Sequence, residues 1–184
     1  IDEHWASFNQ DNPVYDEQYT KDVLAKIKEA KRPVILAGTA IRHANQQNEF
    51  IKCIDKLGIP VVTAWDAHDI IWDEHPLYCG RPGTVGTRAG NFIVQNADLL
   101  IVLGARLSDR VIGNAKEFAK NANIVHIDVD PSEINKNIKA DASIIGDIKE
   151  VLLRLNKKVE KKDNSQWMAH IEELKEQYPL DLDK

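Results

Sequence analysis

Glycine and aspartate residues end or follow three apolar runs of the sequence, and these residue types are suited to holding a nucleotide. Gly38 comes directly after one run, Gly104 ends a second, and Asp128 ends a third. In an open parallel sheet, ligands bind beyond the carboxyl ends of the strands, where free backbone N–H groups gather. A carboxylate there can accept hydrogen bonds from ribose hydroxyls. We therefore expect these three residues to lie close together at one sheet edge, as a candidate nucleotide site.

Two aspartates near the third run have a structural alternative to ligand binding. Asp128 suits capping as well as contact with a ribose, and the sequence leaves both roles open. Asp130 precedes Pro131, Ser132 and Glu133. An aspartate before proline is common at a helix start. We therefore expect Asp130 to be a helix cap first and a ligand contact second.

A glycine-rich loop and several arginines offer a further way to hold a phosphate. The segment GRPGTVGTRAG, residues 80–90, brings bare backbone close to any ligand but does not match the G-x-G-x-x-G fingerprint. A ligand cradle and a set of tight turns are equally open for it. Arginine can bind phosphate with two hydrogen bonds, although a single arginine is more often a surface cation. The arginines concerned are Arg88, Arg106 and Arg110.

The histidines give no catalytic pattern. His126 lies inside an apolar run, where a lone histidine is more often a satisfied core residue than a catalyst. His68 lies near Asp66 and Asp69, but no nucleophile or metal-ligand spacing surrounds them. We therefore assign no role to His126 and expect a loop around His68.

The elements that must position these residues can be recognised from hydrophobic patterning. Short β-branched runs alternate with longer helical patterns, which is typical of βαβ units. The runs lack polar alternation, as strands covered on both faces do. The expected fold is therefore α/β, a three-layer, Rossmann-like, doubly wound parallel sheet of five or six strands. The expected strands are residues 33–37, 60–64, 99–104, 124–128 and 143–146, with 77–80 as a weaker sixth.

Helix signals fall between and after these runs. Gly38 and Gly58 stand where sharp turns and helix ends favour a positive φ. Asp147 precedes an apolar helical stripe and should cap it. Residues 159–164 resemble a linker, and a helix at 165–178 follows, ended by Pro179. Its apolar stripe is Trp167, Ile171, Leu174 and Tyr178.

Composition limits the chain to one globular domain, residues 1–184 with a core at about 18–158. The net charge of -5 argues against nucleic acid, and no apolar run reaches the length of a membrane span. Cys53 and Cys79 form no C-x-x-C pair, which argues against a disulfide framework or zinc ribbon and favours a reducing cytoplasm. Cys53 is expected in the core. The chain begins without methionine, which suggests a piece of a longer protein, although a processed amino terminus would look the same.

Three segments together resemble one known domain. NADLLIVLGARLSDRVIG, IVHIDVDPSEINKN and GDI follow one another in the order and spacing found in the middle domain of acetolactate synthases. The opening KRPVILAG is similar to that domain's first boundary. The closing pattern is similar to its second boundary and comprises Trp167, Ile171, Lys175, Pro179 and Leu180. The resemblance covers nearly the whole chain and implies the fold of NAD/FAD-binding domains of the DHS-like type.

The resemblance implies a parent enzyme that joins or cleaves 2-oxo acids in branched-chain amino acid biosynthesis. Thiamine diphosphate and magnesium would be bound by domains before and after this one, and the parent would be a homodimer or homotetramer. Gly146 and Asp147 are followed by Ile148 rather than glycine, so the diphosphate-binding G-D-G motif has no counterpart here. The isolated chain is therefore expected to be inactive, with no catalytic residue and no metal ligand of its own.

The resemblance also implies FAD in the middle domain, although sister enzymes of this fold bind ADP or nothing. Two departures put the flavin in question: the family's glycine triplet is here Gly38-Thr39-Ala40, and its glycine-rich histidine loop is here residues 80–86. The added side chains narrow the approach. The carried-over cofactor residues are Gly38, Gly83, Thr84, Gly86, Gly104, Ala105, Arg106, Asp109, Arg110, Asp128, Val129, Gly146 and Asp147.

A second hypothesis is a free-standing nucleotide-binding or scaffold domain of the same fold, similar to deacetylase or electron-transfer flavoprotein domains. The deacetylase version would need a cysteine-rich zinc module. Two distant cysteines cannot form one. Thiamine domains encoded on either side of this segment would favour the first hypothesis, and stop codons the second.

Overall fold

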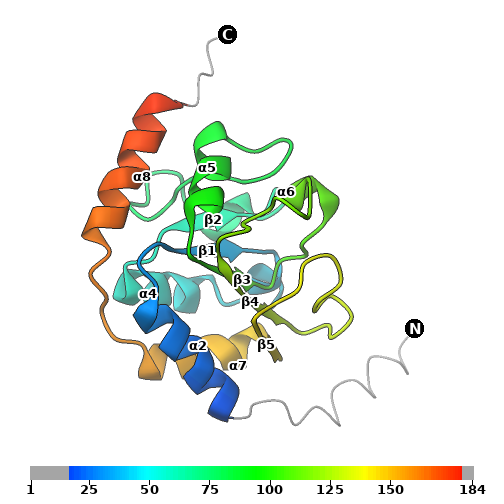
Figure 1. Cartoon of the computed structure of the whole chain (residues 1–184). Coiled ribbons are helices and arrows are strands. Elements are labelled where there is room, and N and C mark those ends of the chain that lie inside the picture. The colour runs from blue at the N-terminus through cyan, green and yellow to red at the C-terminus, as the bar shows by residue number, and fades with distance from the viewer. Residues whose placement is uncertain (1–16, 180–184) are drawn as a thin grey trace.

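A computed structural model describes residues 17–179 of the chain (Figure 1). The residues at the amino terminus and Leu180 of the closing sequence pattern lie outside this range. A central sheet is flanked by helices, and the last helix, α8, lies along one side of the domain (Figure 1).

The sheet has five parallel strands in the order β2-β1-β3-β4-β5. Paired residues run across it as Val61, Ile35, Ile101, Val125 and Ala142. The three central strands are almost entirely buried, as expected of apolar runs with helices on both faces. The strands are β1 (Pro33–Ala37), β2 (Val61–Thr63), β3 (Leu99–Leu103), β4 (Asn123–Asp128) and β5 (Ala142–Ile145).

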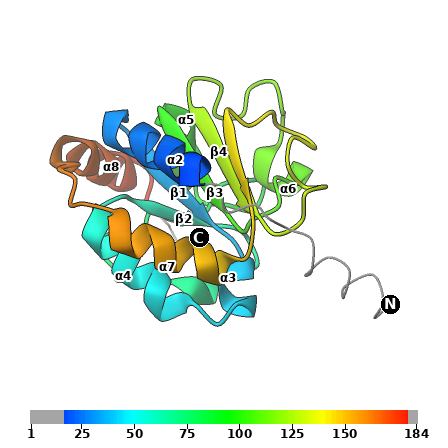
Figure 2. The same ribbon diagram turned by 90° about the horizontal axis from the view of Figure 1, so that it is seen from below.

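Helices cover both faces of the sheet. Figure 2 shows α3, α4 and α7 together on one side, and these three contact one another. On the other side α5 packs against α8, while α2 packs against β5. The helices are α2 (Glu17–Glu29), α3 (Ala40–His43), α4 (Gln47–Leu57), α5 (Arg88–Asn96), α6 (Asp109–Ile112), α7 (Ile148–Lys158) and α8 (Ser165–Gln177), with a 3-10 turn, η1 (His68–Ile70).

The predicted fold class is confirmed, with five strands rather than six. The weaker run at 77–80 forms a single parallel bridge between Tyr78 and Val61 and no strand. Cys53 is buried in the core as expected. Among the described residues, no helix has the length and apolar character needed to cross a membrane.

The segment after β4 differs from expectation because it forms turns instead of a helix. The Asp130 carboxylate accepts hydrogen bonds from the backbone N–H and the hydroxyl of Ser132, at 2.9 and 2.7 Å. Asn135 has a φ of 61°, which a right-handed helix cannot accommodate. Asp130 therefore stabilises a turn and caps no helix.

The expected linker is packed against the domain. Val159 and Asn164 are buried, and the Asn164 amide donates to the Gly58 carbonyl at 2.9 Å. Helix α8 then buries Trp167 and two further apolar side chains, whereas Tyr178 lies just beyond its end and is half-buried. Residues 159–164 thus have no regular secondary structure, but they pack against the domain.

Candidate functional site

Consecutive strand ends meet at one edge of the sheet through backbone hydrogen bonds. The Gly38 N–H donates to Leu103 at 3.0 Å, and the Gly104 N–H donates to Ile127 at 2.8 Å. The Gly146 N–H donates to Asp128 at 2.9 Å. The expectation that Gly38, Gly104 and Asp128 share one carboxyl edge is therefore confirmed.

Strand order places this edge at a topological switch point. The chain leaves β1 toward β2 on one side and later enters β3 on the other side. Connections that diverge between two neighbouring strands leave a crevice there, where ligands of doubly wound sheets bind. Gly38 and Gly104 lie at this point, and a Cβ on Gly38 would lie 2.1 Å from the Gly104 carbonyl oxygen. Gly38 is thus needed because two loops approach each other closely there, and not because of the positive φ that we predicted. Gly58, at the end of α4, does have the predicted positive φ, at 62°.

A groove of about 890 Å³ runs along this edge. Pockets that hold cofactors have volumes of roughly 300 to 1,000 Å³, so its size suits a nucleotide. Its walls come from the segments after β1, β2, β3 and β4. The lining residues are Thr39, Ala40, His43, Ala64, Trp65, Asp66, Gly104, Ala105, Arg106, Ser108, Asp109, Arg110, Val111, Asp128, Val129, Asp130 and Glu133.

Asp128 is the most deeply placed carboxylate of the groove, with 7% of its surface exposed. One oxygen accepts a hydrogen bond from the Asp130 N–H at 2.9 Å. The other has no hydrogen-bond partner among the described residues. Burial raises the pKa of Asp128, although the Asp130 N–H opposes this shift. Asp128 is therefore both a turn-stabilising acceptor and a group with one oxygen left for a ligand.

His126 lies two residues earlier on the same strand and is not the satisfied core histidine that we expected. It is 1% exposed, and neither ring nitrogen has a hydrogen-bond partner. Burial lowers the pKa of His126, while the Asp128 carboxylate, a contact with the Ala105 backbone and the Glu133 carboxylate act in the opposite direction. The ring is therefore held neutral beneath the groove. It does not line the groove.

The three candidate arginines do not form one anion site. Arg88 packs over Tyr178, away from the groove, at 5.4 Å from the ring centroid. Arg106 pairs with Glu133 at 3.6 Å. The guanidinium of Arg110 lies 5.8 Å from the centroid of Trp65, which is about half exposed. Two arginines thus line the groove, and both already contact neighbours.

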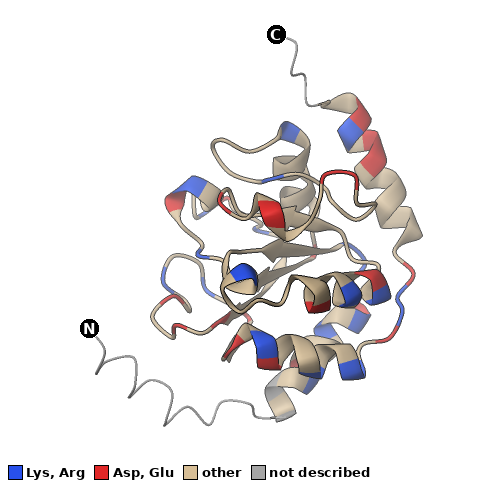
Figure 3. Cartoon of the chain, turned by 180° about the vertical axis from the view of Figure 1, so that it is seen from behind, with Lys and Arg blue, Asp and Glu red and all other residues tan. Residues whose placement is uncertain are grey.

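Carboxylates outnumber cations in the groove. Figure 3 shows basic and acidic segments interspersed over the chain rather than gathered into one basic face. Along the groove, two arginines stand against five carboxylates. These carboxylates belong to Asp66, Asp109, Asp128, Asp130 and Glu133.

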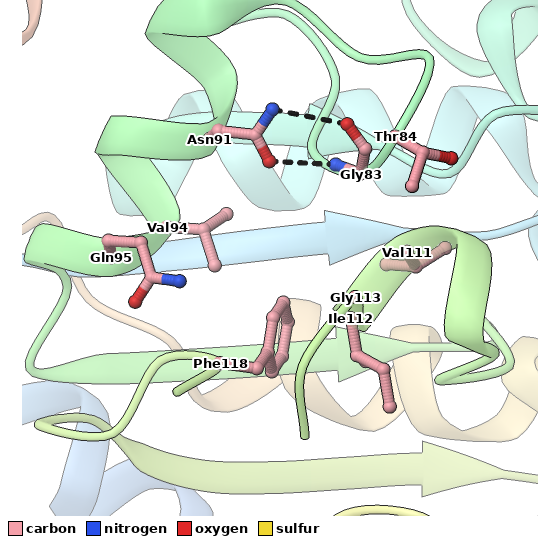
Figure 4. A pocket seen from close by; sticks show the side chains of 9 residues that line it. All are labelled: Gly83, Thr84, Asn91, Val94, Gln95, Val111, Ile112, Gly113 and Phe118. Carbon is pink, nitrogen blue, oxygen red and sulfur yellow. Dashed lines mark hydrogen bonds between the residues drawn. The ribbon is translucent and has the colours of Figure 1, made fainter. Parts of the chain in front are cut away.

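The glycine-rich loop lies beside the groove and is packed mostly on itself. A Cβ on Gly86 would lie 2.2 Å from the Arg81 carbonyl oxygen. Gly83 exchanges two hydrogen bonds with the side chain of Asn91, at 2.9 and 3.1 Å (Figure 4). Gly83 and Thr84 line a separate pocket of about 220 Å³, below the usual size of a cofactor site (Figure 4). The contacts favour tight turns over a ligand cradle.

The structure places some of the remaining predicted site residues in the groove and others outside it. Ala105, Asp109 and Val129 line the groove, whereas Gly38, Gly86, Gly146 and Asp147 do not. Asp147 accepts a hydrogen bond from the Lys149 N–H at 2.7 Å and caps α7, as predicted.

Sequence reasoning missed Trp65 and gave Glu133 no site role. Trp65 is the second residue after β2, and this closeness to a strand end was an available signal. Glu133 gave no such signal because a turn returns it to the groove.

The switch-point groove and the five-stranded parallel sheet define a doubly wound α/β domain of the Rossmann-like class. The family model described as the central domain of thiamine pyrophosphate enzymes matches residues 20–155. The chain belongs to this family.

Similar proteins include acetolactate synthase large subunits. One from Methanocaldococcus jannaschii, described as probable, is 42% identical over 81% of this chain, and one from Methanococcus aeolicus, also described as probable, is 38% identical over 84%. The isozyme 1 large subunit of Escherichia coli is 34% identical over 94%. The match covers 26%, 28% and 30% of these relatives, respectively. The chain thus spans between a quarter and a third of their length.

The groove fits only part of a dinucleotide. A ribose suits the unpartnered oxygen of Asp128. A diphosphate does not fit, because no glycine cradle opens into the groove and carboxylates exceed arginines there. Ala40 also lies close to Gly104: a Cβ built on Gly104 would lie 2.5 Å from the methyl group of Ala40.

Proposed function

We propose that this chain is the central domain of an acetolactate synthase-like enzyme that joins or cleaves 2-oxo acids. In this proposal, thiamine diphosphate and magnesium are bound by domains before and after it in the parent chain. The observation that carries the proposal is the family match over residues 20–155, together with relatives of which the chain spans just over a quarter.

The proposed role of the domain is structural and non-catalytic. Among residues 17–179, no group of histidine, cysteine, aspartate and glutamate side chains is arranged to hold a metal ion. Both cysteines are buried, and burial raises the pKa of each thiol to about 12, so neither supplies a thiolate near neutral pH. The proposed unit comprises a core at 18–158, a linker at 159–164 and a helix at 165–178.

The parent is proposed to be a homodimer or homotetramer in the cytoplasm, in branched-chain amino acid biosynthesis. The domain's own cofactor, FAD or ADP, is proposed to bind weakly at best. Asp128 supports contact with the nucleoside, while the acidic lining opposes the diphosphate.

Expression of the complete coding region tests this proposal. The complete enzyme should form acetolactate from pyruvate in the presence of thiamine diphosphate and magnesium, and lose this activity when either is omitted. Stop codons flanking the segment would instead support the free-standing scaffold. A complete chain with intact thiamine domains but no activity on any 2-oxo acid would contradict the proposal.

A further inference from the structure

The groove contains a buried carboxylate without a counter-charge. Aspartate is almost never this deeply buried unless it is paired. Asp128 receives one backbone N–H, and its other oxygen has no donor among residues 17–179. The nearby histidine is neutral and donates no hydrogen bond to it. The second carboxylate oxygen of Asp128 is therefore open to a hydrogen-bond donor on a ligand.

The charge around Asp128 determines which ligand can supply that donor. The formal charge of the groove side chains is -3, from five carboxylates and two arginines with histidine neutral. Arg106 is partly neutralised by Glu133, and Glu133 also pairs with Lys136 at 2.9 Å. A diphosphate would add negative charge to a surface that already repels it.

The uncharged part of the lining offers apolar surface for a ring. Ala64, Ala105, Val111 and Val129 line the groove together with the half-exposed Trp65, whose ring is also contacted by the Arg110 guanidinium at 5.8 Å from the centroid. A flat ring can pack against such surface, and a vicinal diol can donate to the free carboxylate oxygen. These are the two parts of a nucleoside.

We propose that this groove binds an uncharged nucleoside in preference to the corresponding diphosphate, reversing the preference expected of a dinucleotide site. This inference deepens the proposed function and rests on it for the location of the site. It requires no bond-making step, only hydrogen bonding and ring packing.

Titration calorimetry of the 184-residue chain with adenosine, ADP and FAD tests the proposal. Adenosine should bind more tightly than ADP or FAD. Raising salt from about 0.05 to 0.5 M should strengthen ADP binding, because screening weakens repulsion, and leave adenosine nearly unaffected. A site that attracts phosphate would show the opposite salt dependence.

A charge-neutralised variant sharpens the test. Asp66→Asn with Asp109→Asn should raise the ratio of ADP to adenosine affinity by roughly three- to tenfold. The matched control is Glu160→Gln with Glu176→Gln, which makes the same change in net charge on exposed residues outside the groove. The control should leave the ratio within about twofold.

The role of Asp128 is tested separately. Asp128→Asn can still accept from the Asp130 N–H but loses the charged acceptor, so adenosine binding should weaken by roughly tenfold. Unchanged adenosine affinity in this variant would overturn the proposal. So would tighter binding of ADP at low salt, or no adenosine binding at millimolar concentration.

These outcomes are distinguishable from failure of the proposed function. A groove that prefers ADP would reject the charge inference and leave the central-domain role intact. An inactive complete enzyme would reject that role and leave the measured ligand preference unchanged.

Discussion

At the scale of single residues, His126 has two buried ring nitrogens without a well-formed hydrogen bond, more such atoms than any other residue within 17–179. The nearest backbone contact of the ring is with Ala105, and such buried groups cost roughly 1 to 3 kcal/mol when unsatisfied. The ring is beside the candidate groove rather than in it. Its replacement should therefore affect stability rather than ligand binding.

His126→Leu should raise the melting temperature, most clearly at mildly acidic pH. Burial lowers the pKa of this histidine, so the unfolded chain binds a proton that the folded chain resists. Stability is then lost as pH falls below the ordinary histidine pKa of about 6.5, and the variant should escape this loss. Melting curves at pH 7 and pH 5 measure it, with His43→Gln as the exposed control. A variant less stable than wild type at both pH values would show that the ring makes a needed contact.

Gly38 is the residue on which the meeting of two loops depends. Gly38→Ala would place a methyl group within 2.1 Å of the Gly104 carbonyl oxygen, where backbone must move. Overpacking of this kind costs typically 1 to 3 kcal/mol, which lowers the melting temperature by roughly 2 to 4 °C per kcal/mol.

Thr39→Ala is the neighbouring control for Gly38→Ala. Thr39 precedes α3 without making a side-chain capping bond, so its substitution should have little effect. Equal melting temperatures for the two variants would show that the loops separate at low cost.

At the scale of elements, α8 is tied to the sheet from a distant part of the chain. The Trp167 indole donates to the Pro33 carbonyl at 3.1 Å, and Ile171 is fully buried. Phe92 of α5 stacks on Tyr178 just beyond the helix, with ring centroids 4.7 Å apart. These contacts hold both ends of α8 to the domain.

Truncation at Asp163 should consequently lower the melting temperature. Each large apolar side chain removed from the interface contributes roughly 1.5 to 3 kcal/mol before ordering costs. Ile171→Ala should reproduce part of the effect in the full chain, at about 2 to 5 kcal/mol. The exposed substitution Glu176→Gln should change stability by less than about 0.5 kcal/mol. Unchanged melting temperatures of both the truncated chain and Ile171→Ala would show that α8 contributes nothing to the stability of the fold.

At the scale of the whole molecule, the domain has a groove of nucleotide size at the carboxyl edge of its sheet. The groove carries carboxylates and arginines, and the described residues contain no metal-binding cluster. The chain spans only 26–30% of similar synthase subunits. Chemistry on 2-oxo acids is therefore expected to need the rest of the parent.

The purified chain should neither bind thiamine diphosphate nor convert pyruvate, whatever its flavin content. Calorimetry with thiamine diphosphate and magnesium, followed by an acetolactate assay, measures both. The complete parent enzyme is the positive control. Acetolactate formation by the isolated chain would contradict the central-domain proposal, and a strongly yellow preparation would contradict weak flavin binding.

The sequence by itself determined the strands and the edge at which three of them end. Strands buried on both faces must be continuously apolar, so their positions are local signals, and the residues after them share one edge once the strands are parallel. Asp128, Gly104 and the cap Asp147 could be placed in this way. Ala40, whose methyl group lies close to Gly104, could also be recognised as narrowing the approach.

Only the tertiary structure decided which of these residues face a common groove. Strand order brought Trp65 to the same groove as Asp128, and that order is set by packing between segments far apart in sequence. The loop at 80–90 satisfies its glycines by contacts within the loop and with the Arg110 segment. The local sequence pattern determines where strands and turns begin. The charge balance of the groove and the hydrogen bonding of His126 depend instead on residues far apart in sequence, so only the folded chain showed that the groove is acidic and that the His126 ring lacks well-formed hydrogen bonds.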